Sequence, residues 1–170
     1  MIVAETKRLR IKKFTKSDAA FFLELANSPN WIKYIGDRNL KTVQDAEEYL
    51  KNGAIKSYNT FGFGFYKLEL KSKTNKPIGT CGLVKREELD DVDVGFAMLP
   101  EYEGMGFGFE SSVEILNIAK RQFNLKRIVA ITLPTNKSSI RLLEKLGLSF
   151  EKKVKPFEDD VELLLFAKKL

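Results

Sequence analysis

Residues 95–114 read GFAMLPEYEGMGFGFESSVE, with glycines at positions 104, 106 and 108 between an apolar run and the start of a helix. Each glycine costs about 1 kcal/mol relative to alanine inside a helix, so three of them make a poor start for an ordinary one. The first four N–H groups of a helix lack an acceptor within it, and the helix dipole adds positive charge there. Small residues let an anion such as a pyrophosphate reach those amides. A glycine-rich turn with a purely structural role is the alternative that the loop alone leaves open.

The glycine spacing excludes two familiar nucleotide-binding loops. A dinucleotide-binding turn has the pattern G-x-G-x-x-G at the end of a first strand, whereas this loop reads G-x-G-x-G and lies past the middle of the chain. The phosphate-binding loop of nucleoside triphosphatases needs Gly-Lys-Ser/Thr, which is absent here.

The composition indicates one globular domain that spans residues 1–170. Hydrophobic residues make up 44% of the chain, which is enough to bury a sizeable core. We find no apolar run of membrane-spanning length and no apolar leader within residues 1–14, so we expect a cytoplasmic protein without membrane contact. A single cysteine fits a reducing compartment.

The chain has no histidine and one cysteine, which restricts its chemistry. Zinc sites rarely rest on carboxylates alone, so we expect no metal. The Ser-His and Cys-His pairs that activate nucleophiles are also excluded. Catalysis must therefore use carboxylates, lysine, tyrosine, hydroxyls, backbone amides or water.

The net charge of +6 and the pI of about 9.3 give little guidance on partners. The basic residues are scattered and interleaved with acids, so we expect no nucleic-acid partner. An RNA-binding domain remains an alternative that draws only on the pI.

Hydrophobic periodicity predicts an α/β fold in which a mixed sheet of about seven strands is covered by about four helices. Phe109, Val113, Leu116 and Phe123 mark the expected buried face of the central helix. Asn136 is expected to cap the last helix and Gly147 to end it. A hairpin turn is predicted over residues 73–76. Strands are predicted at 7–14, 61–70, 77–85, 91–99, 127–133, 148–154 and 161–168, and helices at 19–27, 42–51, 109–123 and 136–146.

Two segments together resemble a known family. Residues 99–110 (LPEYEGMGFGFE) and 135–150 (TNKSSIRLLEKLGLSF) resemble the acetyl-CoA-binding core of the GCN5-related N-acetyltransferase (GNAT) superfamily. More narrowly they look like its RimJ/RimL-type branch of ribosomal-protein alanine acetyltransferases. Residues 5–19 (ETKRLRIKKFTKSDA) and the closing strands look like that branch too. The resemblance implies a GNAT fold with a mostly antiparallel central sheet.

The resemblance also implies which residues bind acetyl-CoA. The strand before the glycines is expected to pair its backbone with the pantetheine arm, and Asn136 to bond that arm as well as cap its helix. Ser139 matches a small hydroxyl residue of the family, although a plain hydroxyl in the first helical turn is an equal alternative. Glu103 replaces a common Arg or Gln and is assigned no ligand role. The expected contacts to the pyrophosphate are Gly104, Met105, Gly106, Phe107 and Gly108, and those to pantetheine are Phe96, Met98, Leu99, Asn136 and Ser139.

The catalytic groups are less clear from the sequence. Leu143 occupies the position where many family members carry a tyrosine acid, so Ser139 or water is the candidate proton donor. The base should be a carboxylate because no histidine is available. Asp93 matches an acidic position common in this branch and is preferred. Glu87, Asp91 and Glu162 remain competitors.

The acceptor side is predicted around residues 31–40 (WIKYIGDRNL), in a loop between the first two helices. Trp31 and Tyr34 are candidates to stack on a substrate, and Asp37 to attract its ammonium. The alternative is that Trp31 anchors this loop to the core.

The resemblance implies an acetyl-CoA-dependent N-acetyltransferase that acts by direct transfer in a ternary complex. The acceptor is a protein N-terminal amine or a small-molecule amine, and the protein is a monomer or homodimer. A non-catalytic acyl-CoA-binding sensor on the same fold is the alternative.

Overall fold

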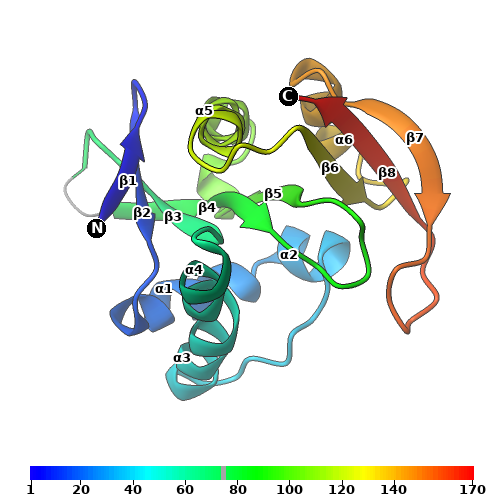
Figure 1. Ribbon diagram of the computed structural model, residues 1–170. Helices are drawn as coiled ribbons and strands as arrows, with labels where there is room; N and C mark the ends of the chain where they lie inside the picture. The colour runs from blue at the N-terminus through cyan, green and yellow to red at the C-terminus, as the bar shows by residue number, and fades with distance from the viewer. Residues whose placement is uncertain (74–75) are drawn as a thin grey trace.

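The computed structural model describes residues 1–73 and 76–170, which form an eight-stranded open sheet with helices on both faces (Figure 1). The strand order is β1-β2-β3-β4-β5-β6-β8-β7. Every neighbouring pair is antiparallel except β5 and β6, which are parallel, so the expected mixed, mostly antiparallel sheet is confirmed. The strands are β1 (Ile2–Glu5), β2 (Leu9–Lys13), β3 (Phe65–Leu70), β4 (Lys76–Val84), β5 (Asp93–Met98), β6 (Arg127–Thr132), β7 (Ser149–Val154) and β8 (Leu163–Lys169).

The strand that the sequence pattern missed is β1. It has four residues and pairs only with β2, so it is too short to show a period of two. The predicted strand at 61–70 begins only at Phe65, because helix α4 extends to Phe61. Residues 74 and 75 of the predicted hairpin turn lie outside the described residues.

The described residues hold six α-helices rather than four. The two additional helices lie at or just after a proline and a glycine, which in a sequence usually indicate that a helix ends. Pro29 begins α2 at the first helical position, where its missing N–H costs nothing. Around Gly53 the chain stays helical through a π-type turn, Lys51–Ile55, that joins α3 to α4. The helices are α1 (Ala19–Ala26), α2 (Pro29–Tyr34), α3 (Val43–Leu50), α4 (Lys56–Phe61), α5 (Phe107–Arg121) and α6 (Lys137–Lys145).

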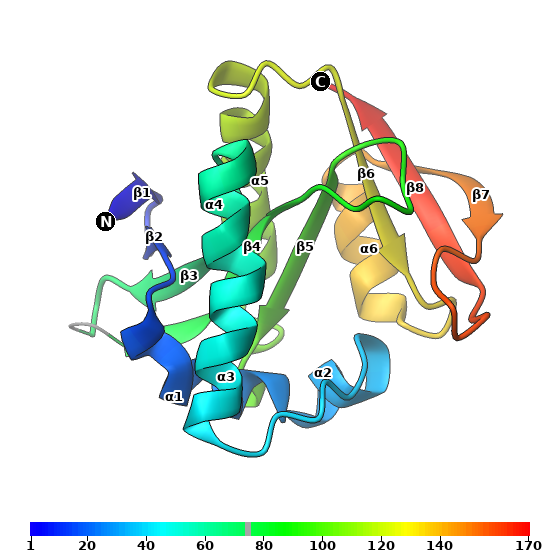
Figure 2. The same cartoon turned by 60° about the horizontal axis from the view of Figure 1, so that its bottom comes forward.

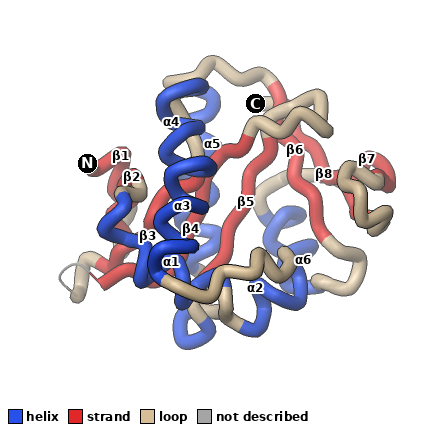
Figure 3. The backbone as a smooth tube through the Cα atoms, turned by 90° about the horizontal axis from the view of Figure 1, so that it is seen from below, coloured by secondary structure: helices blue, strands red, loops and turns tan. Residues whose placement is uncertain are grey.

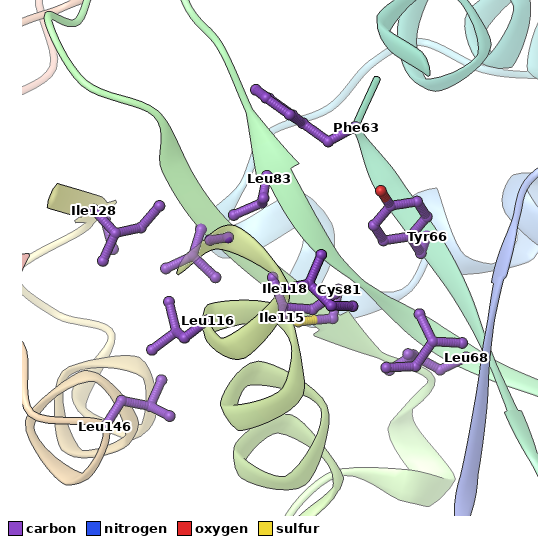
Figure 4. Packing of buried hydrophobic residues seen from close by; sticks show 14 of the residues in the cluster. Phe63, Tyr66, Leu68, Cys81, Leu83, Ile115, Leu116, Ile118, Ile128 and Leu146 are labelled. Atoms are coloured by element: carbon purple, nitrogen blue, oxygen red, sulfur yellow. The ribbon is translucent and has the colours of Figure 1, made fainter. Parts of the chain in front are cut away.

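Helices α1 to α4 cover one face of the sheet, and α5 and α6 cover the other (Figures 1 and 2). The main core lies between α5 and strands β3, β4 and β6, where Ile115 and Ile118 pack against Leu68 and Cys81 (Figure 4).

The buried face of α5 differs from the predicted one. Leu116 is buried as expected, but Val113 is 39% exposed, while the serines at 111 and 112 are fully buried. The Ser111 hydroxyl donates to the Phe107 carbonyl at 2.8 Å, so its polarity is satisfied inside the helix. Small serines let the helix lie close to the sheet, which an apolar periodicity does not reveal.

A buried charge cluster fixes helix α1 to the sheet. Lys67 Nζ lies 2.7 Å from Asp18 at the start of α1 and 3.0 Å from Glu69, and Lys12 Nζ lies 2.9 Å from Glu69. Burial raises the pKa of Glu69, but hydrogen bonds from Lys12 and Lys67 lower it, and the net shift is downward.

The sheet splits between its two parallel strands. Pairing of β5 with β6 is limited to Asp93 and Val129, whose N–H donates to the Val92 carbonyl at 3.1 Å. Beyond that point the strands diverge (Figures 2 and 3). Because the pairing stops, one edge of β5 has no neighbouring strand past that point. The N-termini of α5 and α6 lie near this open end.

Candidate donor and acceptor site

A cavity of about 1560 Å³ extends across strand β5. The half expected to bind the donor (the donor half) runs from the glycine loop to the start of α6. The half expected to bind the acceptor (the acceptor half) lies among α2, α3, α4 and the loops that follow β4 and β7. Three of the expected site residues do not line the cavity: Leu99, Met105 and Asp37. Those that do are Trp31, Tyr34, Asp93, Phe96, Met98, Gly104, Gly106, Phe107, Gly108, Asn136 and Ser139.

The glycine loop has the backbone that an anion site needs. Gly104 and Gly106 adopt φ values of +72° and +84°, a left-handed conformation that costs other residues about 1–2 kcal/mol. Gly106 is the N-cap of the 15-residue helix α5. The first helical amide to find an acceptor is that of Glu110, which donates to Gly106 O at 3.0 Å. The N–H groups of Phe107 and Gly108 therefore have no acceptor within the helix.

Arg8, from the segment between β1 and β2, holds this loop. Its Nε donates to Glu110 Oε1 at 2.7 Å, and its Nη1 donates to the Met105 carbonyl at 3.1 Å. Its guanidinium lies 4.1 Å from the centre of the Phe107 ring. The Arg8 amide and the Thr6 hydroxyl donate to the other Glu110 oxygen. The sequence analysis missed Arg8. The only signal for a cation here was Glu110, an acid in the first turn of α5, and acids are common there without any cationic partner.

Glu103 connects the same loop to the acceptor side. Its carboxylate accepts a hydrogen bond from Asn30 Nδ2 of α2 at 2.5 Å. This contact explains how an acid is tolerated one residue before the glycines, since the charge is directed toward α2.

The open edge of β5 offers main-chain groups to the cavity. Leu99 N–H donates to Ile78 O of β4 at 2.8 Å, so by alternation the main-chain groups of Phe96 and Met98 face the other way, toward β6. The Leu99 carbonyl accepts from Tyr102 N–H at 2.9 Å. Phe96 and Met98 are therefore free to pair with an extended ligand, whereas Leu99 is committed to the protein.

Asn136 caps α6 as the sequence predicts. Its Oδ1 accepts from Ser139 N–H at 3.3 Å, and Gly147 (φ +93°) follows the helix end. Within the described residues, neither the Asn136 side-chain NH₂ nor the Ser139 hydroxyl has a protein partner, and both side chains line the cavity. Leu143 is fully buried in the core and brings no proton donor to the site.

Asp93 lies at the start of β5, where the two parallel strands are still paired. Its side chain is 2% exposed, and its Oδ2 accepts from Arg86 Nε at 2.6 Å. Burial raises the pKa of this carboxyl, and the Arg86 charge opposes part of the shift. The sequence analysis did not predict Arg86, because nothing in the pattern links the end of β4 to the start of β5.

The structure separates the competing acids. Asp91 is paired with Arg127 at 3.0 Å, and Glu162 with Lys153 at 3.6 Å, and neither lines the cavity. Glu87 does line it. Asp93 and Glu87 are therefore the candidates that face the cavity.

The segment predicted to bind the acceptor differs in local structure from the expected loop. Trp31 and Tyr34 lie on helix α2 rather than in a loop, because Pro29 starts a helix there. Trp31 is buried with its ring edge against Phe22 at 5.7 Å, which fits an anchoring role. Tyr34 is half-buried at the cavity wall. The Asp37 carboxylate is exposed and accepts from Asn39 N–H at 2.8 Å, so it stabilises its own turn.

Cys81 is not placed for nucleophilic chemistry. It is fully buried beneath α5, 3.5 Å from the Ser112 hydroxyl, and burial raises the pKa of its thiol to about 11. Residues 1–73 and 76–170 contain no group of three or more acids and cysteines arranged to hold a metal ion. None of the helices in these two ranges has both the length and the apolar character needed to cross a bilayer.

The mixed, mostly antiparallel sheet covered by helices is the fold that the resemblance in the sequence implies. The acetyltransferase (GNAT) domain family matches residues 8–149. The chain therefore belongs to the GNAT acetyltransferase family.

The chain is also similar to individual proteins. It is 28% identical over 146 residues to the uncharacterized N-acetyltransferase YnaD of Bacillus subtilis (strain 168), covering 86% of this chain and 82% of YnaD. It is 25% identical over 154 residues to the uncharacterized N-acetyltransferase p20 of Bacillus licheniformis, covering 90% of this chain and 85% of p20.

Solved structures share the fold at lower identity. RimL, a ribosomal L7/L12 α-N-protein acetyltransferase crystallised with coenzyme A, matches with a TM-score of 0.80 at 14% identity over 100% of this chain and 98% of its own. An acetyltransferase from Agrobacterium tumefaciens matches with a TM-score of 0.83 at 20% identity over 97% of this chain and 92% of its own. The resemblance to the RimJ/RimL-type branch is thus supported at the level of the fold.

Proposed function

We propose that this protein is an acetyl-CoA-dependent N-acetyltransferase that transfers the acetyl group directly to a primary amine in a ternary complex. The observation that carries the proposal is the opening between β5 and β6, with the glycine-rich N-terminus of α5 at its edge. The residues fit the donor, because free helix amides suit a diphosphate and a free strand edge suits the amides of pantetheine.

The donor contacts follow from the geometry. The amides of the loop from Gly104 to Gly108 bind the diphosphate, with the Phe107 side chain buried and only its main chain offered. Phe96 and Met98 pair with the pantetheine arm. Asn136 uses its free NH₂ to bond the same arm while its oxygen caps α6. Leu99 is left out of this set because its N–H is already bonded to Ile78.

The donor supplies an activated thioester, and the protein residues position and polarise it. The Phe96 N–H, which faces the gap, is the candidate donor to the thioester carbonyl. As the amine attacks, a C–N bond forms and the C–S bond breaks, and CoA leaves as a thiolate that takes up one proton. Ser139 or water supplies that proton.

The amine must lose a proton before or during attack, and we assign this step to Asp93, acting through water. A base working near neutral pH benefits from a raised pKa, and burial shifts Asp93 in that direction. Arg86 holds one of its carboxylate oxygens in place. Glu87 is the competing base at the cavity wall.

The acceptor is a protein N-terminal amine or a small-molecule amine that enters beside α2. Tyr34 is the candidate contact, while Trp31 supports the wall from the core. The burial of Cys81 argues against a covalent acetyl-enzyme on that residue and supports direct transfer.

Two measurements on the unmodified protein test the proposal. Calorimetry with CoA and acetyl-CoA should give saturable binding, and absence of heat with both on folded protein would overturn it. Release of free CoA is then followed over a panel of amines and N-terminal peptides. A protein that binds acetyl-CoA but releases no CoA with any amine would be a sensor rather than an enzyme.

A further inference from the structure

The glycines of the loop do not by themselves hold the backbone in one conformation. Gly104 and Gly106 are each free to adopt many backbone conformations, so ordering them costs more entropy than ordering other residues. Asn30 contacts the loop only at Glu103, ahead of the glycines. Beyond Gly104, Arg8 reaches the loop from 97 residues away in sequence, and its Nη1 donates to the Met105 carbonyl.

Arg8 joins both ends of the segment that carries the free amides. Through Nη1 it fixes the Met105 carbonyl, and through Nε it fixes Glu110 in the first turn of α5. Because the peptide unit is planar, holding the Met105 carbonyl also sets the direction of the Gly106 N–H. The guanidinium lies over the Phe107 ring, so Arg8 contacts this segment at Met105, Phe107 and Glu110.

Arg8 also corrects the local charge. Burial raises the pKa of Glu110, but hydrogen bonds from Thr6 and Arg8 lower the pKa by more. The net shift is downward, so Glu110 is an anion at neutral pH. Without a partner this anion would repel a diphosphate at the same helix end. The ion pair at 2.7 Å neutralises it, and the outer Nη2 atom lies 3.3 Å from where a Cβ on Gly106 would stand.

We infer that Arg8 is a positioning residue of the donor site, which holds the amides of the loop from Met105 to Gly108 in the arrangement that binds the diphosphate of the donor. The inference rests on the proposed function, because it needs a diphosphate-bearing donor. Its specific consequence is selectivity, since Arg8 should matter only for donors that carry a diphosphate.

The test compares two acetyl donors, acetyl-CoA and S-acetylpantetheine, which lacks the diphosphate and the nucleotide. Arg8→Met keeps an unbranched apolar side chain and removes the charge and both side-chain hydrogen bonds. Its kcat/KM with acetyl-CoA should fall about tenfold to a hundredfold, mainly through KM, as expected for lost bonds around a charged group. Its kcat/KM with S-acetylpantetheine should stay within about twofold.

Arg10→Met is the matched control. It removes the same charge from the adjoining strand β2, where Arg10 is paired with Glu5 at 3.4 Å. The kcat/KM of Arg10→Met should be unchanged with both donors. Glu110→Gln is the second variant, in case Arg8→Met folds poorly, and should show the same donor selectivity more weakly.

An equal loss for both donors in Arg8→Met and Glu110→Gln would mean a merely structural role and overturn the inference. Unchanged acetyl-CoA kinetics would also overturn it. Failure of the unmodified protein to bind CoA at all would instead overturn the proposed function, so the two failures are distinguishable.

Discussion

Replacing Gly106 by leucine separates the stability of the domain from the affinity of its donor site. Gly106 has φ +84°, and a side chain in this region costs about 1–2 kcal/mol. The new Cβ would lie 3.3 Å from Arg8 Nη2, the mobile end of a long side chain, so the steric cost is small. For a chain of 170 residues the melting temperature should fall by about 2–8 °C, which leaves the domain folded.

The effect of Gly106→Leu on donor binding should be much larger. The leucine covers the helix N-terminus, where each hydrogen bond to a charged phosphate contributes about 1.5–3 kcal/mol. Loss of one such bond weakens CoA binding about tenfold to a hundredfold, and loss of two weakens it further. Calorimetry with CoA, alongside thermal unfolding of the same samples, measures both quantities.

Gly53→Ala is the control for a glycine substitution as such. Gly53 lies in the helical turn between α3 and α4, and a Cβ there meets no atom within 4 Å. The variant should gain about 0.5–1 kcal/mol of stability and bind CoA normally. If Gly106→Leu, still folded, binds CoA within about threefold of the unmodified protein, the loop does not bind the diphosphate and the argument fails.

Asp93→Asn should abolish the increase of turnover with pH, because burial raises the pKa of Asp93 and wild-type turnover should rise as that carboxyl ionises. A rise of turnover with pH in Asp93→Asn like that of the unmodified protein would eliminate Asp93 as the base, whereas Glu87→Gln, at the competing carboxylate, should keep the rise. Glu69→Gln should cost about 1–3 kcal/mol of unfolding free energy in urea at pH 7. Burial raises and two lysines lower the pKa of Glu69, with a net lowering, so this stabilisation is present above its unfolded pKa and should disappear as the pH falls below about 4. An undiminished difference at pH 3 contradicts that assignment. Cys81, with a pKa of about 11 and no exposure, should react with a thiol reagent only on unfolding, and rapid labelling of the native protein would refute its burial.

The features that sequence reasoning predicted well are those set by local chemistry. The α6 helix follows from an asparagine cap and a terminal glycine, and both are found at the expected positions. The glycine loop can be recognised in the sequence because positive φ values leave few alternatives to glycine. In each case the physical cause lies within a few residues, so the sequence pattern records it.

The features that sequence reasoning missed depend on contacts between distant segments. Helix α2 begins at a proline, a residue that is also common at helix ends, and the packing of Trp31 on Phe22 adds to its stability. Arg8 looks like an ordinary strand residue until the fold brings it to Met105, 97 residues away. The partner of Asp93 likewise depends on how the β4–β5 loop folds back.

In the proposed reaction, strand β5 would contact both substrates. A strand presents its main chain in the plane of the sheet and its side chains above and below that plane. Because pairing with β6 stops after Asp93, the main-chain edge at Phe96 and Met98 is left for the donor. The side chains at 93, 95 and 97 project instead toward the face covered by α1 to α4, where the acceptor half of the cavity lies. The Phe65 ring lies against Gly95, where a Cβ would stand 2.9 Å from Phe65 Cε1, and Asp93 is the carboxyl proposed as base. In the proposed reaction the donor would therefore lie along the open edge of β5, and the amine would approach from the face that carries Asp93.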